Sequence, residues 1–414
     1  MEMNIIYDNH PEKVIIPDSV TVEVAVPGMV ARQNERRILL QALAHTTGAM
    51  SSDAFFSRRE SLLILVNDAT RPTPTARALD LMNPMIRHRD VRIMVATGTH
   101  RKPTGDELKT ILGRHYRHFK DRIMVHDARD VSRMECIGRT DRGTEVCFNR
   151  AVTEASDILI IGSVEPHYYA GYTGGRKALM PGVAAYSSVE QNHKLALDDA
   201  AEILTLQGNP VHEDMVVACR MLADKVIFSL QMVLDREDRI FYAAAGDLDE
   251  SLIHAAAAAE SVYTVPVSRK AGVVLAVVNP PLDVNLYQAH KAIEHAARVL
   301  QNGGVLILAA RCREGIGLDH FVRLLQKSTN VNETLHTIEK EYKLGYHKAA
   351  RLARLMARAR IWAVTGVDPE IIQSIGFRPV PSIREVVNEA VRETACGHIC
   401  VIPSAGVTVP VPAE

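Results

Sequence analysis

The chain has 414 residues, of which 47% are hydrophobic, 23% charged and 5% aromatic, with a formal net charge of -1. This composition is typical of a globular protein with room for two domains. It provides no bulk attraction to nucleic acid or anionic membranes and few rings for stacking on single strands. No apolar run is long enough to span a bilayer.

The N-terminus and the cysteines predict a cytoplasmic protein. Met1 to Tyr7 contains an early acidic residue and no apolar signal core. The six cysteines are scattered, as expected of reduced thiols: Cys136, Cys147, Cys219, Cys312, Cys396 and Cys400. Cys396 and Cys400 are close in sequence, but no second Cys/His pair accompanies them, so no structural zinc site is predicted.

Short apolar runs alternate with helical patterns along the first two thirds of the chain. A short hairpin or edge pair is expected over residues 14–24. Strands are then predicted at 62–66, 91–96 and 158–161, and helices at 76–87 and 105–112. This alternation predicts a mostly parallel sheet with helices on its faces.

The pattern restarts near Ala271. Strands are predicted at 273–278, 305–310, 361–365 and 398–403, and a helix at 286–300. The expected fold class is therefore α/β with two domains: a larger N-terminal domain over 1–266, with a mostly parallel sheet, and a smaller C-terminal α/β domain over 267–396. A return of residues 397–414 to the first domain is left open.

Two polar motifs directly follow predicted strands: Asp68-Ala69-Thr70-Arg71-Pro72-Thr73-Pro74 and Ala96-Thr97-Gly98-Thr99-His100-Arg101. Ligands of open parallel sheets bind outside the carboxyl ends of the strands, so both motifs should face one crevice. Asp68 suits ribose hydroxyls, and the Arg71 guanidinium suits a carboxylate. Taken singly, Asp68 and Arg71 are equally well explained as a helix cap and a surface base.

A third motif, Glu165 to Gly182, follows the predicted strand at 158–161 and contains His167, Gly174-Gly175 and Arg176-Lys177. Glycines let the backbone approach a ligand closely. A lysine there can hold a phosphate or bond covalently to a cofactor, although a solvated surface loop is the plain alternative. His100 and His167, on opposite walls of one crevice, can each move a proton near neutral pH.

Two further segments carry candidate ligand-binding residues. A capping box, Ser187 with Glu190 or Ser188 with Gln191, places His193 near a helix start, where its imidazole could bind a metal. Asn285, Gln288 and Lys291 recur at three-residue steps and so share one helix face, which could close over a ligand. The neighbouring His290 and His295 are expected at the surface.

In this order, the motifs resemble the lactate racemase family, the nickel-pincer-nucleotide enzymes. The resemblance covers most of the chain and rests on Asp68-Ala69-Thr70-Arg71-Pro72, Thr97-Gly98-Thr99-His100, Glu165-Pro166-His167, Gly174-Gly175-Arg176-Lys177, Asn192-His193 and Gln288-Ala289-His290-Lys291. It implies an isomerase, specifically a racemase or epimerase of 2-hydroxy acids.

The resemblance also implies a cofactor and residue roles. The cofactor is a nickel pincer nucleotide, pyridinium-3,5-bisthiocarboxylic acid mononucleotide with nickel, attached at Lys177 and loaded by cofactor-biosynthesis proteins. His193 matches the nickel ligand, and His100 and His167 match the acid and base. The remaining matches are cofactor contacts at Asp68, Thr70, Gly174, Gly175 and Arg176, and substrate contacts at Arg71, Gln288 and Lys291. Tyr287 and Trp362 are plausible pocket-wall residues.

Such residues suit the inversion of a 2-hydroxy acid. The α-hydrogen is a poor acid, so moving it as hydride avoids a carbanion next to a carboxylate. One histidine takes the hydroxyl proton, and a planar 2-keto acid can accept the hydride on its other face. A Schiff-base enzyme using Lys177 and a non-catalytic binder of a phosphorylated metabolite remain alternatives. The substrate, among lactate, malate, larger hydroxy acids and sugar acids, is left open.

Overall fold

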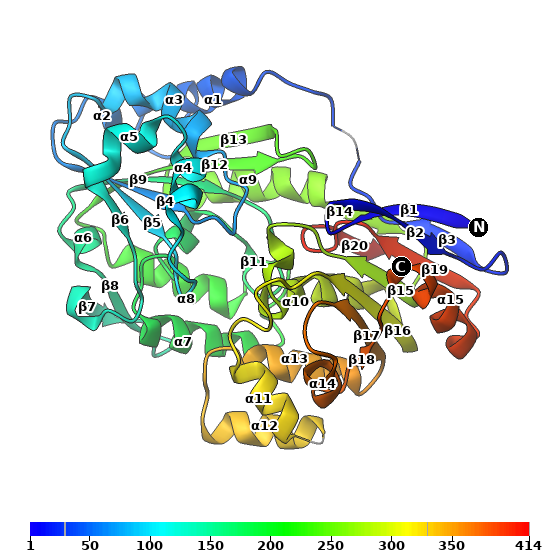
Figure 1. Cartoon of the computed structure of the whole chain (residues 1–414). Coiled ribbons are helices and arrows are strands. Elements are labelled where there is room, and N and C mark those ends of the chain that lie inside the picture. Colours follow the sequence, from blue (N-terminus) through cyan, green and yellow to red (C-terminus); the bar gives the residue numbers. More distant parts are fainter. Residues whose placement is uncertain (29, 329, 414) are drawn as a thin grey trace. The chain divides into compact units, whose positions relative to one another are not determined.

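The chain forms two units, which are described separately. In the computed structural model, residues 1–28, 30–328 and 330–413 are described. The larger unit is the continuous segment Met29–Val262, and the smaller unit combines Met1–Gly28 with Tyr263–Glu414. The junction near residue 262 lies close to the expected boundary, but the first 28 residues belong with the C-terminal part, unlike the predicted domain 1–266 (Figure 1).

The larger unit is built on a six-stranded sheet in the order β13-β12-β9-β4-β5-β6. Its strands are β4 (Leu62–Asn67), β5 (Val91–Ala96), β6 (Ile123–Val125), β9 (Asp157–Ser163), β12 (Val226–Leu234) and β13 (Ile240–Gly246). All neighbours pair in parallel except β12 and β13. The apolar runs predicted at 62–66, 91–96 and 158–161 are confirmed as central strands, and their near-complete burial is typical of parallel strands covered on both faces.

Helices accompany these strands in α/β fashion. The predicted helices are confirmed as α3 (Thr75–Ile86), after β4, and α4 (Gly105–Leu112), after β5. The other helices of this unit are α1 (Glu35–Ala44), α2 (Ser52–Phe56), α5 (His115–Phe119), α6 (Arg150–Thr153), α7 (Tyr186–Lys194), α8 (Pro210–Arg220) and α9 (Leu248–Tyr263). Apolar residues of α1 to α3 pack with those of the sheet in one core.

The strand order reverses at β4. From β4 the chain adds β5 and β6 on one side, and then crosses to add β9 and β12 on the other. The carboxyl ends of β4 and β9 therefore flank a topological switch point, where open α/β sheets leave a crevice for ligands. The first and third polar motifs follow these two strands.

The smaller unit contains a second six-stranded sheet in the order β18-β17-β16-β15-β19-β3. Its strands are β3 (Thr21–Val24), β15 (Ala271–Val277), β16 (Leu300–Ala310), β17 (Arg360–Thr365), β18 (Arg378–Pro379) and β19 (His398–Ile402), all paired in parallel. A return of 397–414 to the first domain is therefore wrong, because β19 is inserted between β15 and β3 and β20 (Val409–Pro412) pairs with β14 (Thr264–Val267).

The N-terminal segment also differs from the expected hairpin over 14–24. The hairpin is formed by β1 (Glu2–Tyr7) and β2 (His10–Ile15), whereas β3 pairs with β19. Apolar residues of this hairpin enter the core of the smaller unit. The helices of this unit are α10 (Leu286–Ala296), α11 (His320–Lys327), α12 (Val331–Lys340), α13 (Tyr346–Met356), α14 (Pro369–Ser374) and α15 (Ile383–Thr394).

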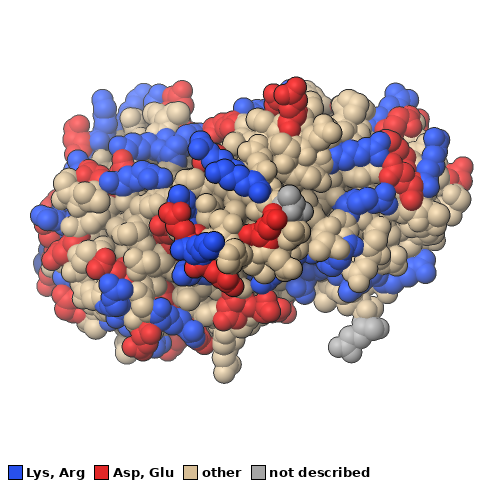
Figure 2. All heavy atoms as spheres, turned by 90° about the horizontal axis from the view of Figure 1, so that it is seen from below, with Lys and Arg blue, Asp and Glu red and all other residues tan. Residues whose placement is uncertain are grey.

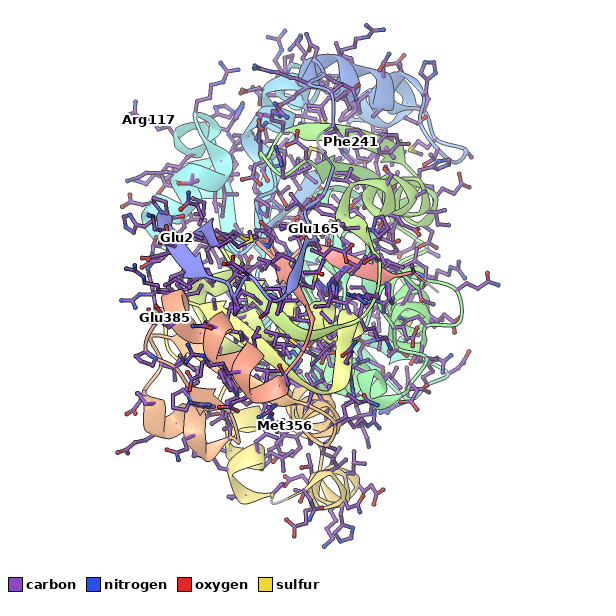
Figure 3. All side chains as sticks on the ribbon, turned by 90° about the vertical axis from the view of Figure 1, so that its right-hand side faces the viewer. Glu2, Arg117, Glu165, Phe241, Met356 and Glu385 are labelled. Atoms are coloured by element: carbon purple, nitrogen blue, oxygen red, sulfur yellow. A yellow bond between two sulfur atoms is a disulfide. The ribbon has the colours of Figure 1, made fainter. Side chains whose placement is uncertain are left out.

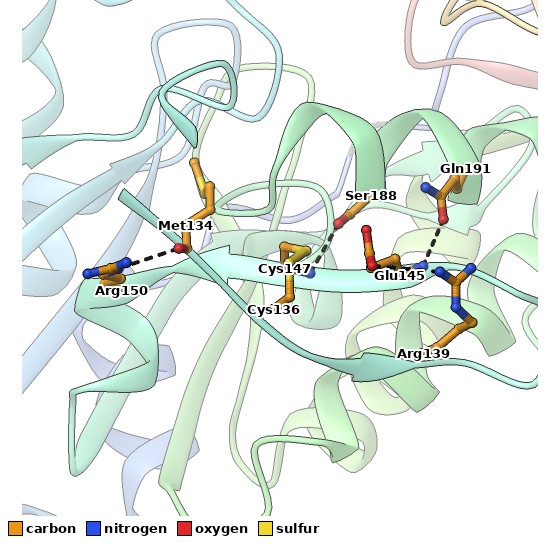
Figure 4. Close-up of a disulfide and its surroundings, with 8 residues drawn as sticks. All are labelled: Met134, Cys136, Arg139, Glu145, Cys147, Arg150, Ser188 and Gln191. Atoms are coloured by element: carbon orange, nitrogen blue, oxygen red, sulfur yellow. Dashed lines mark hydrogen bonds and ion pairs between the residues drawn. A yellow bond between two sulfur atoms is a disulfide. The ribbon is translucent and has the colours of Figure 1, made fainter. Parts of the chain in front are cut away.

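The prediction that all six cysteines are reduced thiols is wrong for one pair. Cys136 of β7 (Met134–Arg139) and Cys147 of β8 (Glu145–Asn149) lie opposite each other in an antiparallel ladder and form a disulfide (Figure 4). The backbone N–H of Cys147 also donates to Ser188 Oγ of α7 at 3.1 Å. The spacing of eleven residues does not reveal that the two strands pair directly.

The surface carries mixed charge. On the face seen in Figure 2, basic and acidic side chains are interspersed, as the near-zero net charge predicts. In the described part of the chain, no helix combines the length and apolarity needed to cross a membrane.

Candidate active site

The three predicted motifs meet at the carboxyl ends of β5, β4 and β9, which are adjacent in the sheet. Direct contacts join the loops: His100 Nδ1 with Asp68 Oδ2 at 2.8 Å, Thr73 Oγ1 with Ser163 Oγ at 2.8 Å, and Gly98 N–H with Gly182 O at 2.9 Å. The predicted convergence of the three motifs is therefore confirmed within the larger unit.

Asp68 and His100 form a hydrogen-bonded pair. His100 Nδ1 donates to Asp68 Oδ2, while the hydroxyl and the backbone N–H of Thr70 donate to Asp68 Oδ1 at 2.7 and 3.0 Å. Burial alone would raise the pKa of Asp68, but His100, Thr70 and Arg71 lower it to about 2. The carboxylate is thus charged and fixes the histidine ring. Because both oxygens have protein partners, its position suits ring orientation better than the predicted ribose contact.

Arg71 lies next to this pair. Its guanidinium Nη1 is 3.4 Å from Thr70 O, and its charge lowers the pKa of both Asp68 and Lys177. Arg71 is half-buried. A half-buried guanidinium near both groups is suited to an anionic ligand.

The loop that carries Lys177 requires glycine. Gly174 has φ +78, and a Cβ there would lie 2.5 Å from Val164 and 2.6 Å from Gln231 Oε1. Gly175 donates its N–H to Gln231 Oε1 at 2.8 Å and begins the 3-10 turn Gly175–Ala178. This loop therefore rests directly on the side chain of Gln231, a buried residue of β12.

A second set of bonds closes the same loop at its start. Glu165 is buried and is labelled among packed side chains in Figure 3. Its N–H donates to Thr173 Oγ1 at 2.8 Å, and the Thr173 N–H donates to Glu165 O at 2.8 Å. The short ladder of β10 (Pro166–His167) with β11 (Gly171–Tyr172) lies between them. His167 is thus held on a defined backbone.

Arg176 stabilises the loop from within. Its side chain is fully buried, and its guanidinium donates to the carbonyls of Ala170 at 2.7 Å, Gly174 at 3.2 Å and Thr173 at 3.4 Å. These bonds satisfy carbonyl groups of the loop itself and hold it together from within, and the cofactor contact of Arg176 stays a prediction.

Lys177 is placed where its amine favours the neutral form. Burial and the nearby charges of Arg176 and Arg71 lower the pKa of Lys177 well below its usual value. Among the described residues, its Nζ has no hydrogen-bond acceptor, and it lies 5.6 Å from the centre of the Tyr169 ring. A lowered pKa increases the neutral, nucleophilic fraction of a lysine amine, so this environment favours covalent chemistry.

Tyr169 brings three of the predicted residues together. Its buried ring lies 4.5 Å from the His167 ring, 5.3 Å from the His193 ring and 5.6 Å from Lys177 Nζ. The first two distances join ring centroids. His167, Lys177 and His193 therefore surround one aromatic side chain, although His193 follows the other two in a separate helix.

The two predicted acid–base histidines have different hydrogen bonds at Nδ1. His100 Nδ1 faces a carboxylate, which only accepts, so Nδ1 carries a proton and the lone pair of the neutral ring is at Nε2. His167 Nδ1 lies 3.4 Å from the Ala170 N–H, which only donates, so the neutral ring carries its proton at Nε2. The backbone and Asp68 thus favour complementary tautomers.

His193 lies in the last turn of α7, not near a helix start. The predicted capping box is wrong, because the N-cap is Ala185, while Ser188 Oγ and Gln191 Oε1 accept from backbone N–H groups of β8. His193 is buried, and its Nδ1 lies 3.3 Å from Asn192 Oδ1, which favours the lone pair at Nε2.

The remaining candidates belong to the smaller unit. Gln288 and Lys291 are buried on α10, which Asn285 caps by accepting from the Gln288 N–H at 2.9 Å. The prediction that His290 and His295 are surface residues is wrong, because both are 1% exposed. Trp362, expected in a pocket wall, is also buried, within the core of this unit: Trp362 lies on β17 with Arg378 over its ring.

Two residues of the site were not predicted. Tyr169 lies inside the third motif, where it attracted no role because aromatic residues are ordinarily core residues. Gln231 is the one polar residue in the apolar run 230–234 of β12, and that interruption is the signal that could have identified it.

Comparisons with known proteins match this arrangement to one family. Residues 7–204 match the family profile described as the lactate racemase N-terminal domain, and residues 267–411 match the lactate racemase C-terminal domain. The chain is 28% identical over 368 residues to the lactate racemase of Thermoanaerobacterium thermosaccharolyticum, covering 86% of each chain. It is also 28% identical over 385 residues to that of Lactiplantibacillus plantarum, covering 89% of each.

Solved structures give the same result for the fold. The lactate racemase apoprotein from T. thermosaccharolyticum superimposes with a TM-score of 0.87 at 27% identity, over the full length of both chains. A protein from Thermotoga maritima has a TM-score of 0.73 at 16% identity, covering 92% of this chain and 98% of that one. The second likeness concerns the fold alone.

Proposed function

The chain belongs to the lactate racemase family, and on this premise we propose that it is an isomerase that racemises lactate or a related 2-hydroxy acid. The observation that carries the proposal is the assembly of His167, Lys177 and His193 around Tyr169. A nucleophilic amine and two imidazoles in one place suit a covalently held, metal-containing cofactor.

The residues fit the nickel pincer nucleotide implied by the family. The Lys177 amine, with its lowered pKa, is suited to covalent attachment, and His193 presents an imidazole lone pair at Nε2 for nickel. When bound, this group would supply reversible acceptance of hydride from C2. We propose that Thr70, Gly174, Gly175 and Arg176 lie against the cofactor, as the family resemblance implies, and that Asp68 orients the ring of His100.

The two histidines then exchange protons with the C2 oxygen. We propose that His100 accepts the hydroxyl proton of one enantiomer at Nε2, while the charged Asp68 at Nδ1 stabilises the resulting imidazolium. We propose that His167, as imidazolium, gives a proton to the oxygen when the opposite enantiomer forms, and that it accepts this proton again in the reverse direction. Arg71 holds the substrate carboxylate beside His100, and Gln288 and Lys291 are the substrate-binding residues proposed in the smaller unit, with Tyr287 adjacent to them.

Loading requires a partner. We propose that cofactor-biosynthesis proteins supply the nickel pincer nucleotide to the folded chain. The cytoplasmic location expected from the sequence stays a prediction.

The test is to co-express the chain with pincer-cofactor biosynthesis proteins and to measure intact mass, nickel content and conversion of L-lactate to D-lactate. We expect an added mass at Lys177, about one nickel per chain, and racemisation. An unmodified, nickel-free chain that racemises lactate would contradict the cofactor assignment. A loaded chain inert toward a panel of 2-hydroxy acids would contradict the reaction.

The lowered pKa of Lys177 also suits a Schiff base, so a second candidate function must be tested. Borohydride reduction in the presence of a carbonyl substrate would fix that substrate on Lys177 if the chain works this way. The same treatment should leave no new adduct on a racemase loaded with the nickel cofactor.

A further inference from the structure

Lys348 is a buried lysine that the proposed reaction does not use. It lies on α13 in the smaller unit and is 2% exposed. Burial lowers the pKa of Lys348 to about 7; the Glu294 carboxylate opposes this shift, and Arg351 adds to it. Removing an amine from water is costly unless the protein supplies hydrogen-bonding partners. The groups that contact the Lys348 amine therefore indicate its role.

The Lys348 amine makes two contacts with Tyr287. Lys348 Nζ donates to the Tyr287 carbonyl at 3.0 Å and lies 4.1 Å from the centre of the Tyr287 ring. Tyr287 is the second residue of α10. In an α-helix, the carbonyl of this residue is directed toward the N–H four residues later, which here is that of Lys291. Lys348 thus contacts both the main chain and the aromatic ring of Tyr287 in the first turn of α10.

A second contact joins the same two helices further along. Arg351 Nη1 lies 3.2 Å from Glu294 Oε2, and His290 Nε2 lies 3.4 Å from Glu294 Oε1. Lys348 and Arg351 are three residues apart, and Tyr287 and Glu294 are two turns apart, so each pair shares one helix face. We call these contacts the α10–α13 seam. Lys348 is its end nearest the start of α10.

The opposite side of the first turn is held by a loop. The Tyr287 N–H donates to Ile316 O at 3.1 Å, and Asn285 packs so closely on Gly317 that a Cβ there would lie 2.7 Å from Asn285 Cγ. The loop at Ile316 and the Lys348 side chain therefore both bond to the first turn of α10, the loop at the N–H of Tyr287 and the lysine at its carbonyl. Gln288 belongs to that turn, and Lys291 lies on the next one.

We propose that Lys348 is a positioning residue that fixes the first turn of α10 and so sets the direction of Gln288 and Lys291 for substrate binding. This inference rests on the proposed function of those two residues. Lys348 acts through Tyr287 as a hydrogen-bond donor and is not a catalytic residue. Because a neutral amine still donates, the contact holds on both sides of neutral pH.

The test compares three variants of the cofactor-loaded enzyme. Lys348→Met keeps the length of the side chain but removes the donor. Lys348→Arg retains a donor that can also stack on the tyrosine ring. Leu352→Ala, one turn later on α13 and 1% exposed, is the control, because it removes core packing from the same helix while the Lys348 amine stays in place. Steady-state kinetics with L-lactate and hydrogen exchange at the amides of residues 288–291 are measured for each.

We expect Lys348→Met to raise KM about tenfold with little change in kcat, as expected when a binding interaction is lost, and to speed exchange at residues 288–291. Lys348→Arg should restore most of both values. Leu352→Ala should lower the melting temperature while KM stays near that of the wild type. Unchanged KM and exchange in Lys348→Met would overturn the proposal, and so would an arginine variant that behaves like methionine.

The outcome separates this inference from the proposed function. If the loaded wild type racemises no 2-hydroxy acid, the proposed function fails, but hydrogen exchange still decides whether Lys348 orders α10. If Lys348→Met does not fold, Lys348→Leu replaces it, because leucine has no donor for the Tyr287 carbonyl. Wild-type exchange in Lys348→Leu would then overturn the proposal.

Discussion

Burial lowers the pKa of two lysines, Lys177 in the larger unit and Lys348 in the smaller unit, but the groups around the two amines differ. Lys177 lies near two arginines and, in the described part of the chain, has no acceptor for its amine. Lys348 faces one carboxylate, Glu294, and donates to a backbone carbonyl. The comparison teaches that burial lowers the pKa of a lysine, whereas its partners decide whether the amine is reactive or structural.

The largest effect should follow from removing the reactive amine. Lys177→Ala should lose all covalently held cofactor and lower racemisation by at least roughly 10³-fold, because the cofactor supplies the chemistry. Intact mass and chiral chromatography measure both. Lys348→Arg is the matched control and should keep the added mass. Full activity of Lys177→Ala with no bound nickel would contradict the assignment of Lys177 as the reactive lysine.

A smaller loss should follow from removing the charge behind His100. Asp68→Asn replaces the charged acceptor of the Nδ1 proton with an amide, which no longer stabilises imidazolium. We expect kcat to fall roughly 10²-fold, within the range of acid–base catalysis, while the added mass at Lys177 is retained. Loss of the cofactor in this variant would instead support the ribose contact predicted from the sequence.

A further, smaller loss should follow from removing the hydrogen bond between Gln231 and the loop that carries Lys177. Gln231→Leu removes the acceptor of the Gly175 N–H, whereas Gln231→Glu keeps an acceptor oxygen. Losing one buried bond should lower the yield of lysine-attached cofactor by about tenfold, and the glutamate variant should lose less. Equal loading of both variants would show that the loop holds Lys177 without this bond.

The smallest effect concerns stability against pH. The folded pKa of Lys348, about 7, lies below its ordinary value of 10.5, so between these values the unfolded chain binds more protons. Unfolding free energy should therefore rise with pH across this window, and the penalty is greatest below pH 7. Denaturant titrations from pH 7 to 10 should show a shallower rise for Lys348→Met. Identical slopes would mean that Lys348 is charged in the folded protein.

Local patterns in the sequence predicted the strands and loops of the larger unit well. The runs at 62–66, 91–96 and 158–161 are apolar apart from Arg92, and each is followed by polar residues. Both the strands and the meeting of His100 with Asp68 therefore follow from one rule about parallel sheets. The placement of Lys177 in a glycine-containing loop is likewise a local property.

Long-range pairing could not be predicted in the same way. The N-terminal β3 pairs with β19, more than 370 residues away, and its short pattern fits a hairpin equally well. His290 and His295 appeared to be surface residues because helical spacing does not show that α13 and residues near 405 cover α10. The Cys136–Cys147 bond depends on strand pairing rather than on the spacing of the cysteines.

The pairing of β3 with β19 has a consequence for synthesis on the ribosome. The larger unit is one continuous segment and has all of its strands once residue 246 has emerged, whereas the second sheet needs its last strand, residues 398–402, before β3 gains a neighbour. The loop with Lys177 can therefore fold before the final strand of the smaller unit has been synthesised. A nascent chain stalled near residue 300 should already protect the segment around Lys177 from protease.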